Sequence, residues 1–280
     1  MNRLNIYITI LFSAFYSISY SQGEEEIKKI RFGIDFGIDF PNKQYAQFLD
    51  GYHPNGVSRI LNAPITRQQI ETKLGYPILD WEFSQANIYS GSVFTGLYLG
   101  FDIKSSFSVV MKLDFSVIRF STPLVIRLDN PQNFTGEYEN SIINAREQRF
   151  LYGLGIEKKF ETETNLTPYA SLGGSFNYIQ LERHELIIAE TKYNIMRINN
   201  LQAVSYQNID GFGYGFYAEG GVSYLLNEKY SIAAGAVFSF QKNEKYVENL
   251  TINSTYNTIK IEDAKGFLPS IGAYIRLIWN

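Results

Sequence analysis

Apolar and polar residues alternate strictly along several parts of the chain. From Ile30 to Phe40 every second residue is Ile or Phe, and the residues between them are Arg, Gly or Asp. Because successive side chains of a β-strand point to opposite faces, this period of two predicts a strand with one apolar face. A helix would distribute both kinds of residue around its whole circumference.

The same alternation occurs eight times in all. The segments that carry it are residues 30–40, 93–103, 107–117, 150–156, 170–178, 212–224, 230–241 and 271–279. Short connections join some neighbours, over 104–106, 161–167 and 227–229, and long ones join the others, over 41–91, 121–147, 179–209 and 242–266. Short turns at one rim and long loops at the other are typical of outer-membrane barrels. We therefore predict an all-β fold, an eight-stranded antiparallel up-and-down transmembrane β-barrel with long extracellular loops.

The two faces of the segments differ in residue size. The apolar set is large and often aromatic, whereas the opposite set consists mainly of Gly, Ser and charged residues. In a membrane barrel the large set meets lipid and the small set fits a narrow interior. Aromatic residues near the segment ends fit the interfacial girdles of such barrels; they are Phe40, Tyr152, Tyr178, Phe240 and Trp279.

Composition agrees with this prediction and excludes several classes of function. Aromatic residues make up 16% of the chain and charged residues only 19%, against roughly 25% charged in ordinary soluble domains. The net charge of -3 provides no excess of cations for a phosphate backbone, so we expect no nucleic-acid partner. Absence of cysteine excludes disulfides and thiol chemistry, and His53 and His184 alone exclude a three-histidine metal site.

The N-terminus has the pattern of a secretory signal peptide. A short basic region ends at Arg3, residues 4–18 are mostly apolar, and Ser19 and Ser21 supply the small residues of a cleavage site. We predict that residues 1–21 are a signal peptide cut after Ser21, and that 22–280 form a single barrel domain. An uncleaved anchor is the alternative, but the apolar run is short and contains serines.

The chain resembles the small bacterial outer-membrane β-barrels of the OmpA/OmpX/PorT-like superfamily. It shares with them the signal peptide, the eight alternating segments, the change between short turns and long loops, and a last segment that ends Ile275-Arg276-Leu277-Ile278-Trp279. In that family the aromatic residue of the last strand is read by the assembly machinery, a role that the resemblance implies for Trp279. The resemblance implies an integral place in the cell outer membrane and names no activity.

Ten charged residues fall on the predicted inner face. They are Arg31, Asp35, Asp39, Asp102, Lys112, Asp114, Arg149, Glu157, Glu219 and Arg276. An eight-stranded barrel is only wide enough for side chains to fill its interior. Since the set mixes acids and bases, we expect a salt-bridged plug, with an ion or proton path as the alternative. Unpaired burial would cost several kcal/mol, so each charge requires a partner.

Two motifs suggest catalysis but lack the required spacing. Glycines at 211, 213 and 215 repeat within a strand, which predicts packing space rather than a phosphate loop. His184 and Glu185 begin like a zinc-protease motif, but Ile188 stands where the second histidine is required. We expect His184 to be a solvent-exposed loop residue and predict no catalytic, cofactor-binding or metal-ligating residue and no cofactor.

The long loop 41–91 contains helix signals and aromatic residues. Residues 66–74 predict a short helix that Thr66 caps and Gly75 ends, and residues 45–49 predict a further helical turn. The loop is either a lid over the barrel mouth or a docking surface for a partner, with aromatic anchors at Tyr45, Phe48, Tyr52, Tyr76 and Trp81. Apolar alternation at 186–189 and 258–261 predicts that some strands continue above the membrane.

These observations lead to a limited statement about function. We expect a non-enzymatic outer-membrane barrel, surrounded by outer-membrane lipid, that presents an extracellular surface to a protein partner or serves as an accessory subunit of a secretion or assembly complex. A lipid-modifying enzyme that uses His184 is the alternative, and a narrow pore is the second alternative.

Overall fold

The computed structural model describes residues 29–42, 57–83, 88–89, 91–132, 137–195, 209–250, 256–261 and 266–280. Its elements are β1 (Ile30–Phe40), α2 (Val57–Asn62), α3 (Pro64–Leu74), β2 (Ile78–Phe83), β3 (Ile88–Tyr89), β4 (Ser92–Lys104), β5 (Phe107–Leu128), β6 (Glu137–Lys159), β7 (Leu166–Ile188), β8 (Thr191–Asn194), β9 (Ile209–Asn227), β10 (Tyr230–Leu250), β11 (Tyr256–Ile261) and β12 (Leu268–Trp279). The predicted signal peptide lies outside these residues. Neither described helix has the length and apolarity to cross a bilayer.

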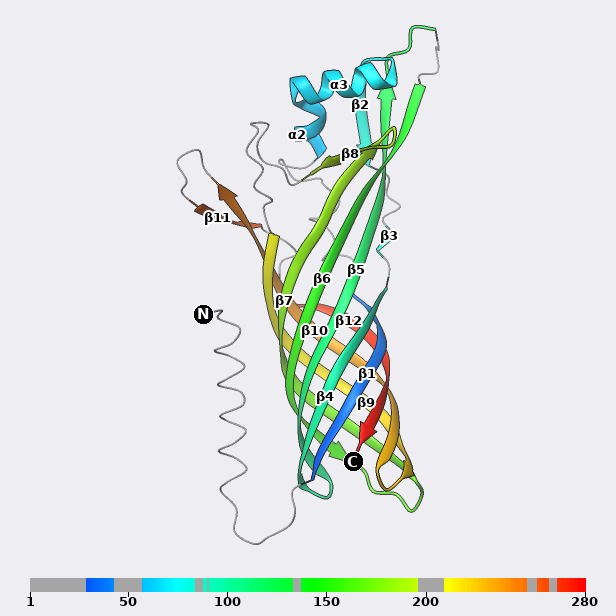
Figure 1. Ribbon diagram of the computed structural model, residues 1–280, viewed down its shortest axis with the longest axis vertical. Coiled ribbons are helices and arrows are strands. Elements are labelled where there is room, and N and C mark those ends of the chain that lie inside the picture. Colours follow the sequence, from blue (N-terminus) through cyan, green and yellow to red (C-terminus); the bar gives the residue numbers. More distant parts are fainter. Residues whose placement is uncertain are drawn as a thin grey trace.

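Eight strands close into one antiparallel barrel (Figure 1). Each barrel strand pairs with the next one along the chain, in the order β1, β4, β5, β6, β7, β9, β10 and β12. The last strand then pairs with the first, from Phe32 opposite Trp279 to Phe40 opposite Ile271. The predicted eight-stranded up-and-down barrel is therefore confirmed, and it has the architecture that the resemblance implied.

The outer surface of the barrel is a belt of large apolar side chains. Phe36 is 59% exposed, Leu172 is 61% exposed and Phe216 is 63% exposed. Water-exposed apolar patches of this extent are not found on ordinary soluble domains. Every barrel strand is paired on both edges, so the backbone N–H and C=O groups bond within the sheet, as a lipid environment requires. The chain is therefore an integral barrel of the outer membrane, the membrane in which such single-chain barrels occur.

Aromatic girdles mark both ends of the apolar belt. On one side Phe115, Phe150, Tyr178 and Phe212 contact one another across four strands. On the opposite side Trp279 contacts Phe32 and Tyr230. Ten residues separate Tyr230 from Phe240 on β10, which at about 3.3 Å per residue and a tilt of roughly 40° spans about 25 Å. This height matches the hydrocarbon layer of an outer membrane.

Strands β5, β6 and β7 continue far beyond the belt (Figure 1). The predicted long loop 121–147 is wrong, because β5 and β6 stay paired as far as Leu128 opposite Glu137. Predicted strand continuation at 186–189 is confirmed by β7, which reaches Ile188, and at 258–261 by β11. Because outer-membrane barrels have short turns toward the periplasm and longer connections toward the outside, we refer to this part of β5, β6 and β7, with the elements packed on it, as the extracellular extension.

The apolar face of β5 changes sides at the membrane surface. Within the belt the exposed apolar residues have odd numbers, such as Leu113 at 38% exposure, whereas Lys112 is buried inside the barrel. Beyond Val117 the buried residues have even numbers, and they are Ile118, Phe120, Thr122, Leu124, Ile126 and Leu128. The strand keeps its pairing throughout. In the membrane the outward face of β5 is apolar because it contacts lipid. Above the membrane that face contacts water, and the inward face is the apolar one.

The extension has a hydrophobic core of its own. Helices α2 and α3 lie over the buried face of β5, β6 and β7, and β2 extends this sheet by pairing with the upper part of β5, from Ile78 opposite Leu128 to Phe83 opposite Leu124. The fully enclosed members of this core include Val57, Leu61, Leu124, Ile126, Ile143 and Leu186. We call this cluster the extracellular core.

Helix α3 confirms the predicted helix with a different start. It begins at Pro64, which follows the N-cap residue Ala63, and no side chain caps it. The predicted cap at Thr66 is therefore wrong, because proline already fixes the first turn and lacks the N–H that a cap would satisfy. Gly75 ends the helix as predicted, with φ of 81° and its N–H bonded to the carbonyl of Glu71. The predicted turn at 45–49 lies outside the described residues.

Candidate functional site

The barrel interior is organised around Arg276 of β12, whose side chain is almost completely buried. Its guanidinium donates to both carboxylate oxygens of Asp35 on β1, at 2.6 and 2.9 Å. The two residues face each other in the strand register, so the sheet itself aligns them. Glu219 and Glu157 lie 3.7 and 4.0 Å from the same guanidinium. This bidentate geometry is the strong form of an ion pair.

A second arginine continues the network toward the periplasmic rim. Arg31 lies 3.0 Å from Glu157 and 3.1 Å from Asp102, and it also donates to the Ser108 hydroxyl. On the other side of Arg276, the ammonium of Lys112 forms an ion pair with Glu219. Seven of the ten predicted residues are therefore joined in one network, and they are Arg31, Asp35, Asp102, Lys112, Glu157, Glu219 and Arg276.

The remaining three predicted residues lie beside this network, around a cavity that Asp35, Lys112 and Glu219 also line. Asp39, Asp114 and Arg149 line this cavity on the extracellular side of Arg276. Arg149 forms an ion pair of 2.5 Å with Glu147, a residue outside the predicted set of ten. The interior is thus ordered in layers along the barrel axis, with the continuous ion-pair network nearer the periplasm.

Four inward-pointing tyrosines complete the network. The alternation of the last strand places Tyr274 on the inner face, whereas Tyr98, Tyr169 and Tyr217 are not predicted by the pattern. Tyr98 lies 3.9 Å from the Arg276 guanidinium, face on, and its hydroxyl contacts Glu157. Tyr274 and Tyr169 share a hydrogen bond of 2.7 Å, and Tyr217 lies under the ammonium of Lys112. Since aromatic residues count as apolar in an alternation analysis, only the phase of the strand reveals that these side chains point inward.

Small residues make room for these tyrosines. A Cβ added to Gly173 would stand 2.6 Å from the Tyr217 ring, and one added to Gly235 would stand 2.8 Å from the Tyr274 hydroxyl. Gly213 and Gly215 leave similar room for Asn243 and for the backbone of β10. The interpretation of glycines in this region as packing space is confirmed at these two positions.

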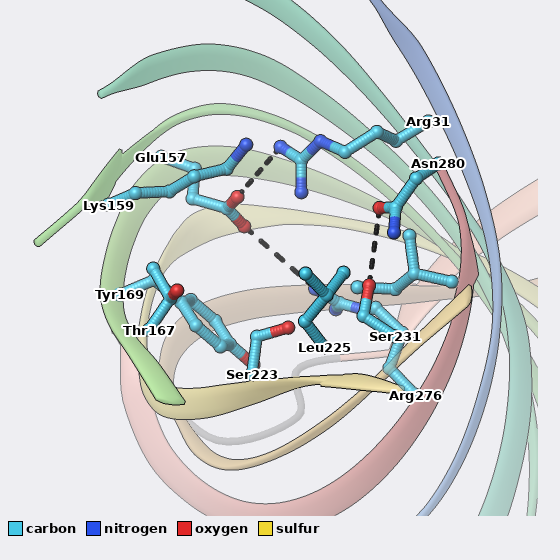
Figure 2. A pocket seen from close by; sticks show the side chains of 11 residues that line it. Arg31, Glu157, Lys159, Thr167, Tyr169, Ser223, Leu225, Ser231, Arg276 and Asn280 are labelled. Atoms are coloured by element: carbon cyan, nitrogen blue, oxygen red, sulfur yellow. Dashed lines mark hydrogen bonds and ion pairs between the residues drawn. The ribbon is translucent and has the colours of Figure 1, made fainter. Parts of the chain in front are cut away.

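Two separate cavities flank the network. The inner one has a volume of about 150 Å³ and faces the periplasmic end, where Arg31, Lys159, Glu157 and Arg276 surround it with hydroxyl groups (Figure 2). The outer one measures about 70 Å³. The cavities share no lining residue, because Arg276, stacked on Tyr98 and Tyr274, lies between them. Among the described residues the barrel interior is therefore a packed layer with a cavity at each end.

The candidate catalytic histidine lies elsewhere. His184 is on β7 in the extension and is only 2% exposed, so the expectation of a solvent-exposed loop residue is wrong. The cause is a β-bulge that places Glu182 out of register and turns His184 to the buried face. Across the part of the chain that the structure describes, no three His, Asp or Glu side chains are grouped so that they could hold a metal ion.

The predicted docking aromatics fall into two groups. Tyr76 and Trp81 are partly buried against the extracellular core. Tyr45, Phe48 and Tyr52 lie outside the described residues. Large apolar side chains that remain exposed on the extension are those of Ile65, Leu79, Tyr138 and Ile142.

Comparison with known proteins gives similarity of architecture only. No family model matches the chain, and no curated protein matches it significantly. OprG from Pseudomonas aeruginosa is 12% identical with a TM-score of 0.42, covering 90% of this chain and 96% of that one. A major outer membrane protein from Thermus thermophilus is 8% identical with a TM-score of 0.39, covering 90% and 99%. Neisserial surface protein A is 10% identical with a TM-score of 0.36, covering 91% and 99%. At these values the fold assignment rests on the strand pairing and apolar belt of this chain.

Proposed function

We propose that this outer-membrane barrel is neither an enzyme nor an open pore, and that it presents its extracellular extension to a protein partner. The observation that carries the proposal is the extracellular core. Closing a barrel needs only two or three residues between strands, as the turn at 228–229 demonstrates. Here helices and extended strands instead build a second packed body outside the membrane. Long ordered segments of this kind normally serve a function.

The contents of the barrel support the same proposal. Ion pairs and tyrosines fill the interior between the two cavities, which is the expected state of a plug rather than a conducting path. The residues proposed to meet a partner are the exposed apolar ones of the extension, beginning with Ile65 and Leu79. A role as an accessory subunit of a secretion or assembly complex fits a surface of this type. The lipid around the barrel is a second partner, and no nucleic-acid partner is expected.

Co-purification from native membranes after crosslinking tests the proposal. The double variant Ile65→Asp/Leu79→Asp replaces exposed side chains and leaves the extracellular core intact, so folding should be unaffected. We expect at least a tenfold loss of the crosslinked partner. Gln69→Asp, at an exposed polar position of α3, is the matched control and should retain it. Undiminished crosslinking in the double variant, or a steady current through the parent barrel in planar bilayers, would contradict the proposal.

A further inference from the structure

Three arginines lie side by side across neighbouring strands. Arg119 of β5 is the register partner of Arg146 on β6, and Arg146 is the register partner of Arg183 on β7. Neighbouring strands are about 4.8 Å apart, so the row extends over about 10 Å. We call these three residues the arginine row.

The β-bulge in β7 creates the last member of this row. Register partners on either side of the bulge are Arg146 with Arg183 and Glu147 with Leu181, so Glu182 has no direct partner in the ladder. A regular strand would have placed Glu182 opposite Arg146, giving an ordinary cross-strand pair of opposite charge. The bulge puts a third cation, Arg183, in the ladder position opposite Arg146, while the Glu182 carboxylate still reaches the Arg146 guanidinium from the side, at 2.8 Å.

All three side chains point away from the barrel, on the face that lower down meets lipid. On β5 and β6 the residues on either side of Arg119 and Arg146 are buried, as is His184 beside Arg183. Arg119 is exposed, and the side chains of Arg146 and Arg183 are 42% and 54% exposed.

The arginine row lies at the height of the lipid headgroups. Phe115 and Phe150 of the extracellular girdle are each four residues from the row on their strands. Four residues of a tilted strand rise about 10 Å. The headgroup layer of a bilayer begins at the girdle and is about 5–8 Å thick on each side. The backbone of the row therefore lies at the outer boundary of this layer, and the long arginine side chains can reach the phosphates within it.

The acids beside Arg146 and Arg183 do not balance the cations around them. Glu182 lies 2.8 Å from Arg146, and Glu185 lies 3.9 Å from Arg183 while it also faces Lys192 at 4.0 Å. Arg146, Arg183 and Lys192 thus share the carboxylates of Glu182 and Glu185. Like charges directly opposite each other in a sheet are destabilising, and an anion that bridges them removes this repulsion. Guanidinium groups are particularly suited to phosphate because they donate in a bidentate fashion.

We infer that the arginine row is a binding site for the phosphate groups of an anionic lipid in the outer leaflet. The lipid would lie with its acyl chains along the apolar belt below Phe115 and Phe150 and its phosphates against Arg119, Arg146 and Arg183. This site is independent of the proposed protein partner, since it lies on the outward face at the membrane surface.

Lipid binding by the full-length protein in detergent tests this inference, with native mass spectrometry to count bound lipid. The probes are diphosphoryl lipid A, the same lipid with both phosphates removed, and inorganic phosphate. We expect saturable binding of the diphosphoryl lipid and at least tenfold weaker binding of the dephosphorylated one. The triple variant Arg119→Gln/Arg146→Gln/Arg183→Gln should bind the diphosphoryl lipid at least tenfold more weakly, since a cation at a membrane surface contributes on the order of fivefold.

The matched control is Arg127→Gln/Lys158→Gln. Arg127 lies on the same strand and face as Arg119 but higher, paired with Asp80, and Lys158 is exposed at the periplasmic end of β6. This control should bind within twofold of the parent. Equal binding of both lipids by the parent, unchanged binding in the triple variant, or competition by inorganic phosphate at equal concentration would overturn the inference. If the triple variant does not fold, Arg183→Gln alone should weaken binding about threefold to fivefold, and no change there would overturn it as well.

Discussion

At the residue scale, Arg276 shows how much of the interior the sequence could predict. Alternation placed Arg276, Asp35 and Glu219 on one inner face, and the requirement that buried charges be paired predicted that they meet. Which acid pairs with which base depends on register, because Asp35 lies opposite Arg276 only once β1 and β12 close the barrel. Tyr98 was not predicted to point inward, because tyrosine is counted as apolar when the two faces of a strand are assigned from the alternation.

Removing the central cation should destabilise the barrel strongly. Arg276→Met leaves Asp35 buried and unpaired, and breaking a buried pair in this way costs about 3–5 kcal/mol. The free energy of unfolding, measured by urea titration in detergent, checks this. The double variant Arg276→Met/Asp35→Asn removes both charges and should recover a substantial part of the loss. A single variant as stable as the parent would mean that the pair is not the centre of the plug.

At the element scale, the strands were predictable within the membrane and not above it. Alternation identified every barrel strand, but β5 was expected to stop near Val117 because its apolar phase ends there. The next apolar residue, Ile118, begins the opposite phase, and Ser121, Thr122 and Pro123 then interrupt the pattern. Where the outer face of a strand passes from lipid to water, the apolar residues move from the outer face to the inner face although the strand continues. The alternation therefore predicts a strand end that is not there.

The phase change predicts a large effect for one substitution and almost none for another on the same strand and face. Leu113→Arg places a cation against hydrocarbon and should destabilise the barrel by roughly 2–4 kcal/mol. Val125→Arg, twelve residues further along β5, lies beyond the membrane and should change stability by about 0.5 kcal/mol or less. Refolding into lipid vesicles at graded urea concentrations measures both. Equal effects would show that the membrane boundary on β5 is misplaced.

Helix α3 predicts an acid-sensitive contact in the extension. Arg67 donates to Glu71 at 2.8 Å and the Ile78 N–H donates to the same carboxylate, and these hydrogen bonds hold the pKa of Glu71 below its ordinary value. The stabilisation is fully present above the unfolded pKa of about 4.3 and is lost as pH falls through the lowered pKa of the folded state. Proteolytic cleavage between α3 and β2 should accelerate in that acid range.

Glu71→Gln is the control for this titration. It cannot ionise, so cleavage between α3 and β2 should lose its dependence on pH below about 5, while Gln69→Glu should keep the behaviour of the parent. The same acid response in Glu71→Gln would assign the effect to another group.

At the scale of the whole molecule, the barrel and the extension have separate sources of stability. The ion pairs and tyrosines of the interior lie between the girdles, whereas the extracellular core draws on Ile and Leu residues above them. The charged interior of the barrel could be predicted from the sequence, because alternation assigns the residues of both faces of a strand. The extracellular core could not be predicted from the sequence, because it joins α2, α3 and the upper parts of three strands through contacts between residues distant in the chain.

This separation predicts that the barrel survives without its extension. A trimmed chain, in which 43–89, 122–143 and 184–207 are each replaced by a short turn, keeps every strand pair of the belt and the Arg276 network. It should insert into vesicles and, as we also expect of the parent, migrate differently on gels with and without boiling. Planar bilayers should show no steady current from either chain, because the plug lies within the retained part. Retained insertion with lost crosslinking to the protein partner is the expected result, and a trimmed chain that no longer folds would mean that the extension is a structural lid on which the barrel depends.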